Sequence, residues 1–306
     1  RHLEGCGQAI LLAVTLGPGV DAQIRRAGVG DIAAGVASDA LGSALAEQTA
    51  DAAEAELRQL AASGYREVVL SAISLPSYGL DTGTNLVELV EKCARVEGIE
   101  RIRLGSLDPD MLTPEYITRL AAVDKLCPQY HLSLQSGCSA TLRRMRRVYT
   151  AEQYTQVVDQ IRAAYGERPV SFTTDCICGF PGETEEDFRE SCEFLKEIGF
   201  LKVHVFPYSR RKGTPAADMP GQIPNAVKER RAAEAASAAA ELEAQYHTSM
   251  LGTTQQVLFE QEENGLYAGH AMNYIKVYVQ AADLHNEIRA VRVTELYRDG
   301  VLGELE

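Results

Sequence analysis

Four polar segments of this chain, each at the end of an apolar stretch, hold side chains able to bind a ligand. They are Gln135-Ser136-Gly137, Thr173-Thr174-Asp175, the glycine-rich segment 179–183 and Arg210-Arg211-Lys212. Parallel strands that end together bring such segments to one edge of a sheet, where ligands bind. The glycines allow close backbone approach. Each segment alone also fits an ordinary turn, but their order along the chain predicts one ligand-binding rim that carries positive charge.

Cysteine thiols are the second group with possible chemistry. Seven are present, at positions 6, 93, 127, 138, 176, 178 and 192. The number is odd and the spacing fits no disulfide scaffold, so we expect reduced thiols in a cytoplasmic protein.

The elements that position these groups alternate between strand and helix patterns. We expect strands at 10–16, 67–73, 101–107, 130–134, 170–177 and 202–207, and helices at 51–63, 86–97, 114–123, 151–165 and 185–198. Thr113 before Pro114, and Thr184 three residues before Asp187, are typical helix starts. Six βα units are fewer than the eight of a complete barrel. The predicted fold class is therefore α/β, a partial TIM-like barrel whose open side admits a large substrate.

The last quarter of the chain changes in character. An Ala- and Glu-rich helix is expected at about 225–247, followed by short strands at 255–260, 274–280, 287–296 and 303–306. Gly265 and Gly269 are interpreted as turn residues between them. This pattern predicts a small all-β module, plausibly a barrel. The predicted domains are 1–247, of which 1–50 is divergent, and 248–306.

Composition limits the possible partners. The 306 residues are 45% hydrophobic, which is enough for a substantial core, and the formal net charge is −13. No apolar run is long enough to cross a membrane. An acidic protein binds a polyanion only through local positive charge. Three basic clusters offer it, although each also fits a solvated surface: Arg143 to Arg147, Arg210 to Lys212, and Lys228 with Arg230 and Arg231.

The order of four sequence blocks resembles the radical-SAM methylthiotransferases. The blocks are HLSLQSGC, RRMRRVYT, TTDCICGFPGET and VHVFPYSRRKGTP, between His131 and Pro215. The likeness extends over about 51–306, because NYIKVYV and VTELYRDGVLGEL resemble the TRAM domain of that family. FPYSRRKGTPA is most similar to the branch that methylthiolates threonylcarbamoyladenosine beside the tRNA anticodon.

The resemblance implies cofactors and sites. It implies a 4Fe-4S cluster and S-adenosylmethionine, one molecule of which methylates sulfur while another is cleaved to a radical that opens an adenine C–H bond. No catalytic side chain is assigned. Cys6 matches a cluster ligand, and the remaining expected positions fall into two sets. Those for the cofactor are Gln135, Ser136, Gly137, Arg147, Thr174, Asp175 and Gly179, and those for RNA are Arg210, Arg211, Lys212 and Lys276.

The chain departs from the family at its cluster loop. The family pattern is Cys-x3-Cys-x2-Cys, and Glu4-Gly5-Cys6 matches its start, but Ile10 and Ala13 occupy the next two ligand positions. Neither side chain binds iron. A local shift of reading frame and a divergent, cluster-free descent both explain this. The family's N-terminal domain with its second cluster is also not represented, so we expect an incomplete or inactive form.

Three functions remain open. The first is tRNA methylthiolation by a cytoplasmic monomer. The second is methylthiolation of a ribosomal protein, favoured by nine acids against four Lys or Arg from Thr248 onward. The third is binding of S-adenosylmethionine or RNA without turnover.

Overall fold

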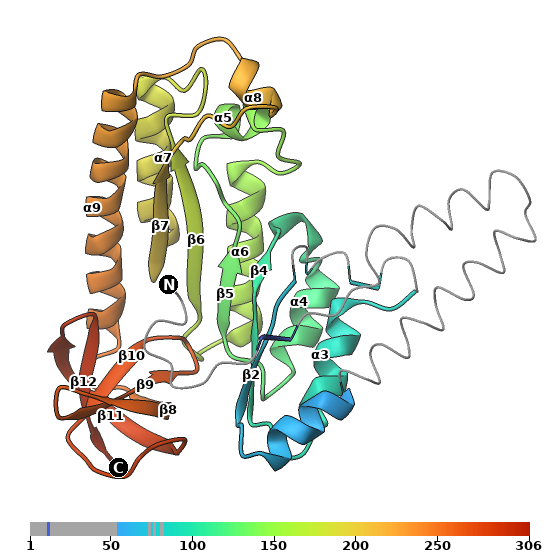
Figure 1. The fold of residues 1–306 in the computed structure, drawn as a ribbon, viewed down its shortest axis with the longest axis vertical. Coiled ribbons are helices and arrows are strands. Elements are labelled where there is room, and N and C mark those ends of the chain that lie inside the picture. Colours follow the sequence, from blue (N-terminus) through green and yellow to red (C-terminus); the bar gives the residue numbers. More distant parts are fainter. Residues whose placement is uncertain (1–10, 13–53, 73–74, 76–77, 80–82) are drawn as a thin grey trace, which may run out of the picture. The chain divides into compact units, whose positions relative to one another are not determined.

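The structure is a computed structural model that describes residues 11–12, 54–72, 75, 78–79 and 83–306 (Figure 1). Most of the divergent segment, with Cys6, lies outside these residues. Six strands pair in parallel in two sheets, and five later strands close into a barrel. The predicted fold class is thereby confirmed. Among the described helices, none has the length and apolar character needed to cross a membrane.

The chain divides into two compact units, and the first contains the sheet β1-β2-β3. Its strands are β1 (Leu11–Leu12), β2 (Glu67–Leu70) and β3 (Arg101–Leu104). A helix spans 54–62, and α3 (Leu86–Ala94) begins after Asn85, whose side chain accepts a hydrogen bond from the Glu88 amide. Both helices confirm the expected patterns at 51–63 and 86–97, and α3 ends three residues earlier than expected.

The expected strand 101–107 is divided at Gly105. β3 ends at Leu104, and β4 (Ser106–Leu107) follows. The Gly105 amide donates to the Leu70 carbonyl at 2.8 Å, and a Cβ on Gly105 would lie 2.9 Å from Ser71 Oγ. Gly105 therefore packs closely against the end of β2. The turn η2 (Pro109–Met111) and α4 (Pro114–Ala121) follow. Thr113 Oγ1 accepts from the Tyr116 amide at 3.2 Å, as its position before Pro114 predicts.

The second unit contains the parallel strands β5 (Gln129–Leu132), β6 (Ser171–Cys178) and β7 (Lys202–Pro207). Its helices are α5 (Ser139–Arg144), α6 (Ala151–Tyr165), α7 (Glu185–Ile198), α8 (Pro215–Asp218) and α9 (Asn225–Ser249). The predicted bounds of α6, α7 and β7 are correct. α7 begins with the expected reciprocal capping by Thr184 and Asp187.

Side chains of β6 alternate between two faces of the sheet. Thr174, Cys176 and Cys178 belong to the face that the helices cover, since Cys178 neighbours Cys192 of α7. Asp175 therefore points to the opposite, inner face. Figure 1 shows α9 running alongside β7.

The C-terminal module is a closed barrel in the order β10-β12-β11-β8-β9. The strands are β8 (Thr254–Glu263), β9 (Leu266–Ala271), β10 (Lys276–Val279), β11 (Ile288–Tyr297) and β12 (Gly300–Leu305). The sequence interpretation missed β9 because it took Gly269 as a turn residue. Gly269 lies within β9, where a Cβ would be 2.2 Å from the Leu258 carbonyl oxygen. The glycine permits close strand packing.

The barrel packs against the amino ends of β6 and β7. Leu201, directly before β7, belongs to the same buried apolar cluster as Phe259 and Val277. Ser171 Oγ, at the start of β6, donates to the Asn273 carbonyl at 2.6 Å. The carboxyl ends of β6 and β7 therefore lie at the other end of these strands from the barrel.

Candidate functional site

Gln135 joins the end of β5 to β6. Its amide donates to the Asp175 carbonyl and its carbonyl accepts from the Ile177 amide, both at 2.9 Å. The backbone φ of Gln135 is 69°, in the left-handed region that residues other than glycine seldom adopt. Strained backbone of this kind is often found at functional sites. The structure thus brings together two of the segments that sequence spacing assigned to one rim.

Ser136 and Gly137 fasten the same loop to α7. The Ser136 hydroxyl is buried and lies 2.9 Å from the Ser191 hydroxyl. A Cβ on Gly137 would lie 2.6 Å from Phe194 Cβ, so only glycine allows α7 to approach this closely. Both residues are expected cofactor contacts, and in the structure they also hold the loop that carries Gln135.

Thr174 and Asp175 are adjacent in β6 but serve different faces. The Thr174 hydroxyl is fully buried, donates to the Leu132 carbonyl and accepts from the Leu134 amide at 3.0 Å. It therefore fixes β5 against β6 on the helix side. The Asp175 side chain is 37% exposed on the inner face. Of these two expected cofactor contacts, Asp175 is the one with a solvent-exposed side chain.

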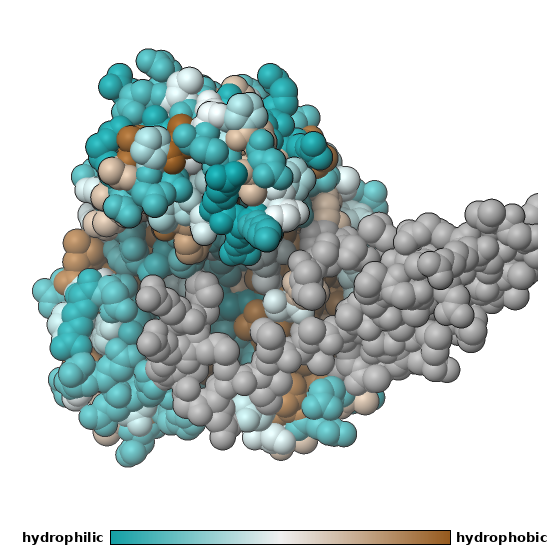
Figure 2. Space-filling view, turned by 45° about the horizontal axis from the view of Figure 1, so that its top comes forward, coloured by the Kyte–Doolittle hydropathy of each residue, from teal (hydrophilic) through white to brown (hydrophobic). Residues whose placement is uncertain are grey.

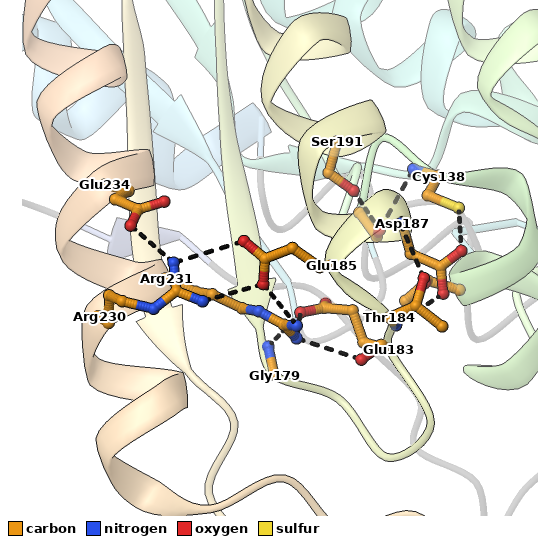
Figure 3. A network of polar contacts seen from close by, with 12 residues as sticks. Cys138, Gly179, Glu183, Thr184, Glu185, Asp187, Ser191, Arg230, Arg231 and Glu234 are labelled. Carbon is orange, nitrogen blue, oxygen red and sulfur yellow. Dashed lines mark hydrogen bonds and ion pairs between the residues drawn. The ribbon is translucent and has the colours of Figure 1, made fainter.

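The glycine-rich segment is held by a buried ion pair, shown in Figure 3. The Gly179 amide donates to Glu183 Oε1 at 2.9 Å, and Arg231 Nη1 of α9 lies 2.8 Å from the same oxygen. The exposed fractions of the Glu183 and Arg231 side chains are 2% and 6%. Burial raises the pKa of Glu183, although the Gly179 amide and Arg231 act in the opposite direction.

Gly179 itself cannot be another residue without rearrangement. Its φ is +78°, and a Cβ would lie 2.3 Å from Lys228 Cγ. Arg230 forms ion pairs with Glu185 at 2.9 Å and Glu234 at 2.7 Å. The third basic cluster is therefore a structural connection between α9 and the segment 179–185, as Figure 3 also shows for its two arginines.

Arg147, an expected cofactor contact, forms an ion pair with an aspartate of the same chain. Its Nη1 lies 3.5 Å from Asp108 Oδ1, and both side chains are partly exposed. Within the same basic cluster, Arg144 Nη2 donates to Asp187 Oδ2. Both arginines therefore form ion pairs within the protein.

Sequence reasoning missed two histidines on the inner face. His131 Nδ1 lies 3.0 Å from Thr173 Oγ1, and His131 Nε2 lies 3.8 Å from Asp175 Oδ2. The His204 ring is 6.1 Å from the His131 ring, between centroids. β6 and β7 pair Asp175 with His204, so both point to one face. Their placement depends on the register between β5, β6 and β7, for which the sequence holds no local signal.

The predicted RNA contacts fall at two separate places. Arg210, Arg211 and Lys212 are exposed in the loop after β7, and the Tyr208 amide joins this loop to Cys178 at the end of β6 with a 2.8 Å hydrogen bond. They share the carboxyl edge with Asp175. Lys276 does not, because it belongs to the barrel at the amino ends of the strands.

Lys276 is also neutralised by its own neighbours. Its side chain is 20% exposed, and Nζ lies 2.9 Å from Glu263 Oε2 and 3.4 Å from Asp299 Oδ2. Although burial lowers it, the pKa of Lys276 is raised overall by hydrogen bonds with Tyr278 and Glu263. A paired ammonium group of this kind is poorly suited to bind phosphate.

The cysteines of the described residues do not fit a three-cysteine cluster site. Burial raises the pKa of Cys93, Cys127 and Cys192 to about 11, which favours the neutral thiol over the thiolate that binds iron. In the described part of the chain, one group has metal-ligand spacing, and it contains a single sulfur: Cys138 with Asp187 and Glu190. Asp187 already bonds Arg144 and the Thr184 amide. Cys6 lies outside the described residues.

Comparison with known proteins places the chain. The sequence model of the Radical SAM superfamily matches residues 39–195. The chain is 35% identical over 253 residues to the threonylcarbamoyladenosine tRNA methylthiotransferase MtaB of Chlamydia pneumoniae, covering 82% of this chain and 59% of that protein. It is 36% identical over 255 residues to the tRNA-2-methylthio-N(6)-dimethylallyladenosine synthase of Caldicellulosiruptor saccharolyticus, covering 82% and 54%. Coproporphyrinogen III oxidase (HemN) from Escherichia coli aligns at 15% identity with a TM-score of 0.49, covering 81% of this chain and 58% of that chain.

The fold and the rim define an α/β enzyme scaffold with its ligand edge at the carboxyl ends of parallel strands. The chain belongs to the radical SAM superfamily, and it is similar to curated tRNA methylthiotransferases. It spans between half and three fifths of the length of these two curated relatives. The family implies S-adenosylmethionine and a 4Fe-4S cluster as cofactors, and the second of these is the one that the cysteines present do not fit.

Proposed function

We propose that this chain is the barrel and TRAM-like part of a tRNA methylthiotransferase whose substrate is threonylcarbamoyladenosine next to the anticodon. The observation that carries the proposal is the shared edge: backbone bonds join Gln135 to Asp175 and Tyr208 to Cys178, and the cations of 210–212 follow directly. The similar proteins act on modified adenosines of tRNA by name. We further propose 1–247 as the barrel domain and 248–306 as the TRAM-like domain.

S-adenosylmethionine is proposed to bind at this edge. The Gln135 side chain and the backbone around Gly179 are the groups that the loops present there, whereas Ser136, Gly137 and Thr174 keep the loops in position. The cofactor supplies the methyl group and the radical in the family's chemistry. The protein orients it and excludes competing reactions.

Turnover is proposed to be absent in this chain as it stands. Ile10 and Ala13 occupy the positions of two cluster ligands, and the group with metal-ligand spacing in the described part of the chain contains a single sulfur. After anaerobic incubation with iron and sulfide, we expect no absorption band of an iron–sulfur cluster at ~400 nm. We also expect no formation of 5′-deoxyadenosine from S-adenosylmethionine. Detection of 5′-deoxyadenosine from the purified chain contradicts this proposal.

Binding to RNA tests the substrate directly, without a cluster. We expect an anticodon stem-loop to bind with strong salt dependence, and to bind more tightly with threonylcarbamoyladenosine than with dimethylallyladenosine beside the anticodon. Fluorescence anisotropy measures both affinities. The control is a stem-loop of the same length that lacks a purine at the position beside the anticodon. Equal binding of the two modified forms contradicts the proposed branch, and absence of binding contradicts the proposed substrate.

A ribosomal-protein substrate is the second candidate, and the charge of the barrel favours it. Lys276 is paired with Glu263 and Asp299, so the module contributes no free ammonium at that position. An acidic surface suits a basic protein tail. Tighter binding of a basic peptide than of the stem-loop at the same ionic strength supports this candidate.

A further inference from the structure

A chain of polar contacts on the inner face of β5 and β6 leads to the Asp175 carboxylate. Gln129 Nε2 donates to Thr173 Oγ1 at 3.3 Å, and Thr173 Oγ1 lies 3.0 Å from His131 Nδ1. Gln129 and Thr173 are both buried. In the tautomer in which Thr173 Oγ1 donates to His131 Nδ1, the ring proton is on Nε2, the nitrogen that faces Asp175 at 3.8 Å.

This arrangement holds the His131 ring beside a carboxylate that solvent can reach. The His131 side chain is 16% exposed and the Asp175 side chain 37%. The buried partners Gln129 and Thr173 fix the position of the ring before a ligand arrives, as is typical of residues beside a binding site.

An exposed aromatic ring lies on the same face. Phe206 is 50% exposed, one of five large hydrophobic side chains that are exposed in the described part of the chain. β7 pairs it with Ile177, and His204 pairs with Asp175, so alternation places Phe206 and Asp175 on one face. Figure 2 shows hydrophilic residues over much of the described surface in that view, with hydrophobic residues between them.

Positive charge follows directly after this ring. Arg210, Arg211 and Lys212 begin four residues beyond Phe206 and are exposed. An aromatic face, a hydrogen-bond acceptor and nearby cations are the three elements by which proteins bind an unstacked RNA base and its phosphates.

We propose that the inner face binds the adenine base of the substrate, with Phe206 stacking on the ring and Asp175 accepting a hydrogen bond from the N6–H group. The inference rests on the proposed RNA substrate and assigns its base-recognition residues. N6–H is the donor that remains when adenosine carries one substituent at N6, so an acceptor is the group that recognises all such forms. Asp175 thereby becomes a substrate contact, and His131 a positioning residue that acts through it.

The experiment compares three stem-loops that differ in a single group. They carry adenosine, N6-methyladenosine or N6,N6-dimethyladenosine beside the anticodon, and the third lacks any N6–H. We expect the unaltered protein to bind the first two with similar affinity and the third about tenfold more weakly, because a charged acceptor loses its donor. Asp175→Ala is expected to bind all three equally, while Phe206→Ala weakens all three by a similar factor.

Asp159→Ala is the matched control. Asp159 is an exposed carboxylate on α6 with a single distant ion pair, so the substitution makes the same change of charge away from the inner face. It is expected to keep the tenfold difference. The three RNAs test the unaltered protein even if a variant fails to fold.

The outcomes separate this inference from the proposed function. Similar binding of all three RNAs by the unaltered protein overturns the N6–H contact and leaves the RNA substrate intact. No binding of any stem-loop overturns both. If Asp175→Ala keeps the discrimination and loses affinity for S-adenosylmethionine instead, Asp175 belongs to the cofactor and the inference is wrong.

Discussion

Glu183 and Arg231 form a buried ion pair of 2.8 Å that connects the glycine-rich segment to α9. Removing one partner leaves a buried charge without compensation, which typically costs about 3–5 kcal/mol. We therefore expect Arg231→Ala to lower the free energy of unfolding by roughly 3 kcal/mol, measured by urea denaturation at pH 7.

Arg230→Ala is the comparison for that measurement. Arg230 is a neighbour on the same helix and pairs with Glu185 and Glu234, but its side chain is 46% exposed. Exposed pairs contribute at most about 1 kcal/mol. Similar losses for the two arginines are the result that our account does not allow.

Asp187 is expected to make stability depend on acid. Although burial raises it, the pKa of Asp187 is lowered overall by hydrogen bonds from the Thr184 amide and Arg144. A lowered pKa contributes stability that is present above the unfolded value near 3.8 and lost as the pH falls through the folded value. Asp187→Asn is thus expected to cost about 1–2 kcal/mol at pH 7.

The pH profile distinguishes this from a general loss of packing. The difference in unfolding free energy between the two proteins should shrink below about pH 4, as the carboxylate becomes protonated. Asp159→Asn, at an exposed site on α6, should show little difference at any pH. The loss of unfolding free energy in Asp187→Asn could also stay constant down to about pH 2.5. That result would show that the ion pair and the cap are not its cause.

Local sequence signals predicted the helices that begin with a recognisable N-terminal cap. α7 was placed correctly because Thr184 and Asp187 form a recognisable cap, and α4 because Thr113 precedes Pro114. β9 was missed because glycine occurs both in turns and at close contacts between strands, so the sequence alone does not show which role Gly269 has. The close approach of Leu258 decides between these, and it is a tertiary contact.

The candidate site was predictable as an edge but not in its detail. Parallel strands made it possible to group Gln135 with Asp175. The direction of the Thr174 side chain toward the helices depends on strand register. The position of His131 and His204 on the same face as Asp175 depends on it as well. The sequence predicted Lys276 as a cation that contacts RNA. Its ion pair with Glu263 connects β10 to the end of β8, and no local sequence signal indicates that contact.

The partly buried Cys192 thiol should react slowly. Burial, with a smaller effect of neighbouring Cys178, raises the pKa of Cys192 to about 11. Only about one thiol in a thousand is then ionised at pH 8, so iodoacetamide should modify Cys192 far more slowly than glutathione in the same tube. The rate is expected to rise about tenfold per pH unit between about 8 and 10. Peptide mass spectrometry measures it, and a rate that levels off by about pH 9 contradicts the raised pKa.

Gly179→Ala should be costly through two effects. A positive φ costs a side chain about 1 kcal/mol, and the added Cβ would also meet Lys228 Cγ at 2.3 Å. Lys228 cannot easily yield, because its Nζ donates to the Tyr208 carbonyl at 2.9 Å. We expect a loss of roughly 2 kcal/mol or more in unfolding free energy.

Gly199→Ala separates the strain from the clash. Gly199 also has a positive φ, of +68°, in the left-handed region, but nothing lies within 4 Å of its added Cβ. Thermal denaturation of both variants should give a clearly larger decrease in Tm for Gly179→Ala. Equal decreases would show that packing against Lys228 contributes nothing.

The cations after β7 and the lysine of the barrel should differ in RNA binding. Arg210, Arg211 and Lys212 are exposed at the carboxyl edge, whereas Lys276 is paired with acids at the other end of the strands. Each phosphate contact on single-stranded RNA contributes about −0.7 to the slope of log K against log salt. Changing all three cations to alanine should therefore reduce that slope by about 2, while Lys276→Ala leaves it nearly unchanged. Anisotropy titrations of the stem-loop over a range of salt concentrations measure the slopes, and a larger effect of Lys276→Ala would move the RNA surface to the barrel.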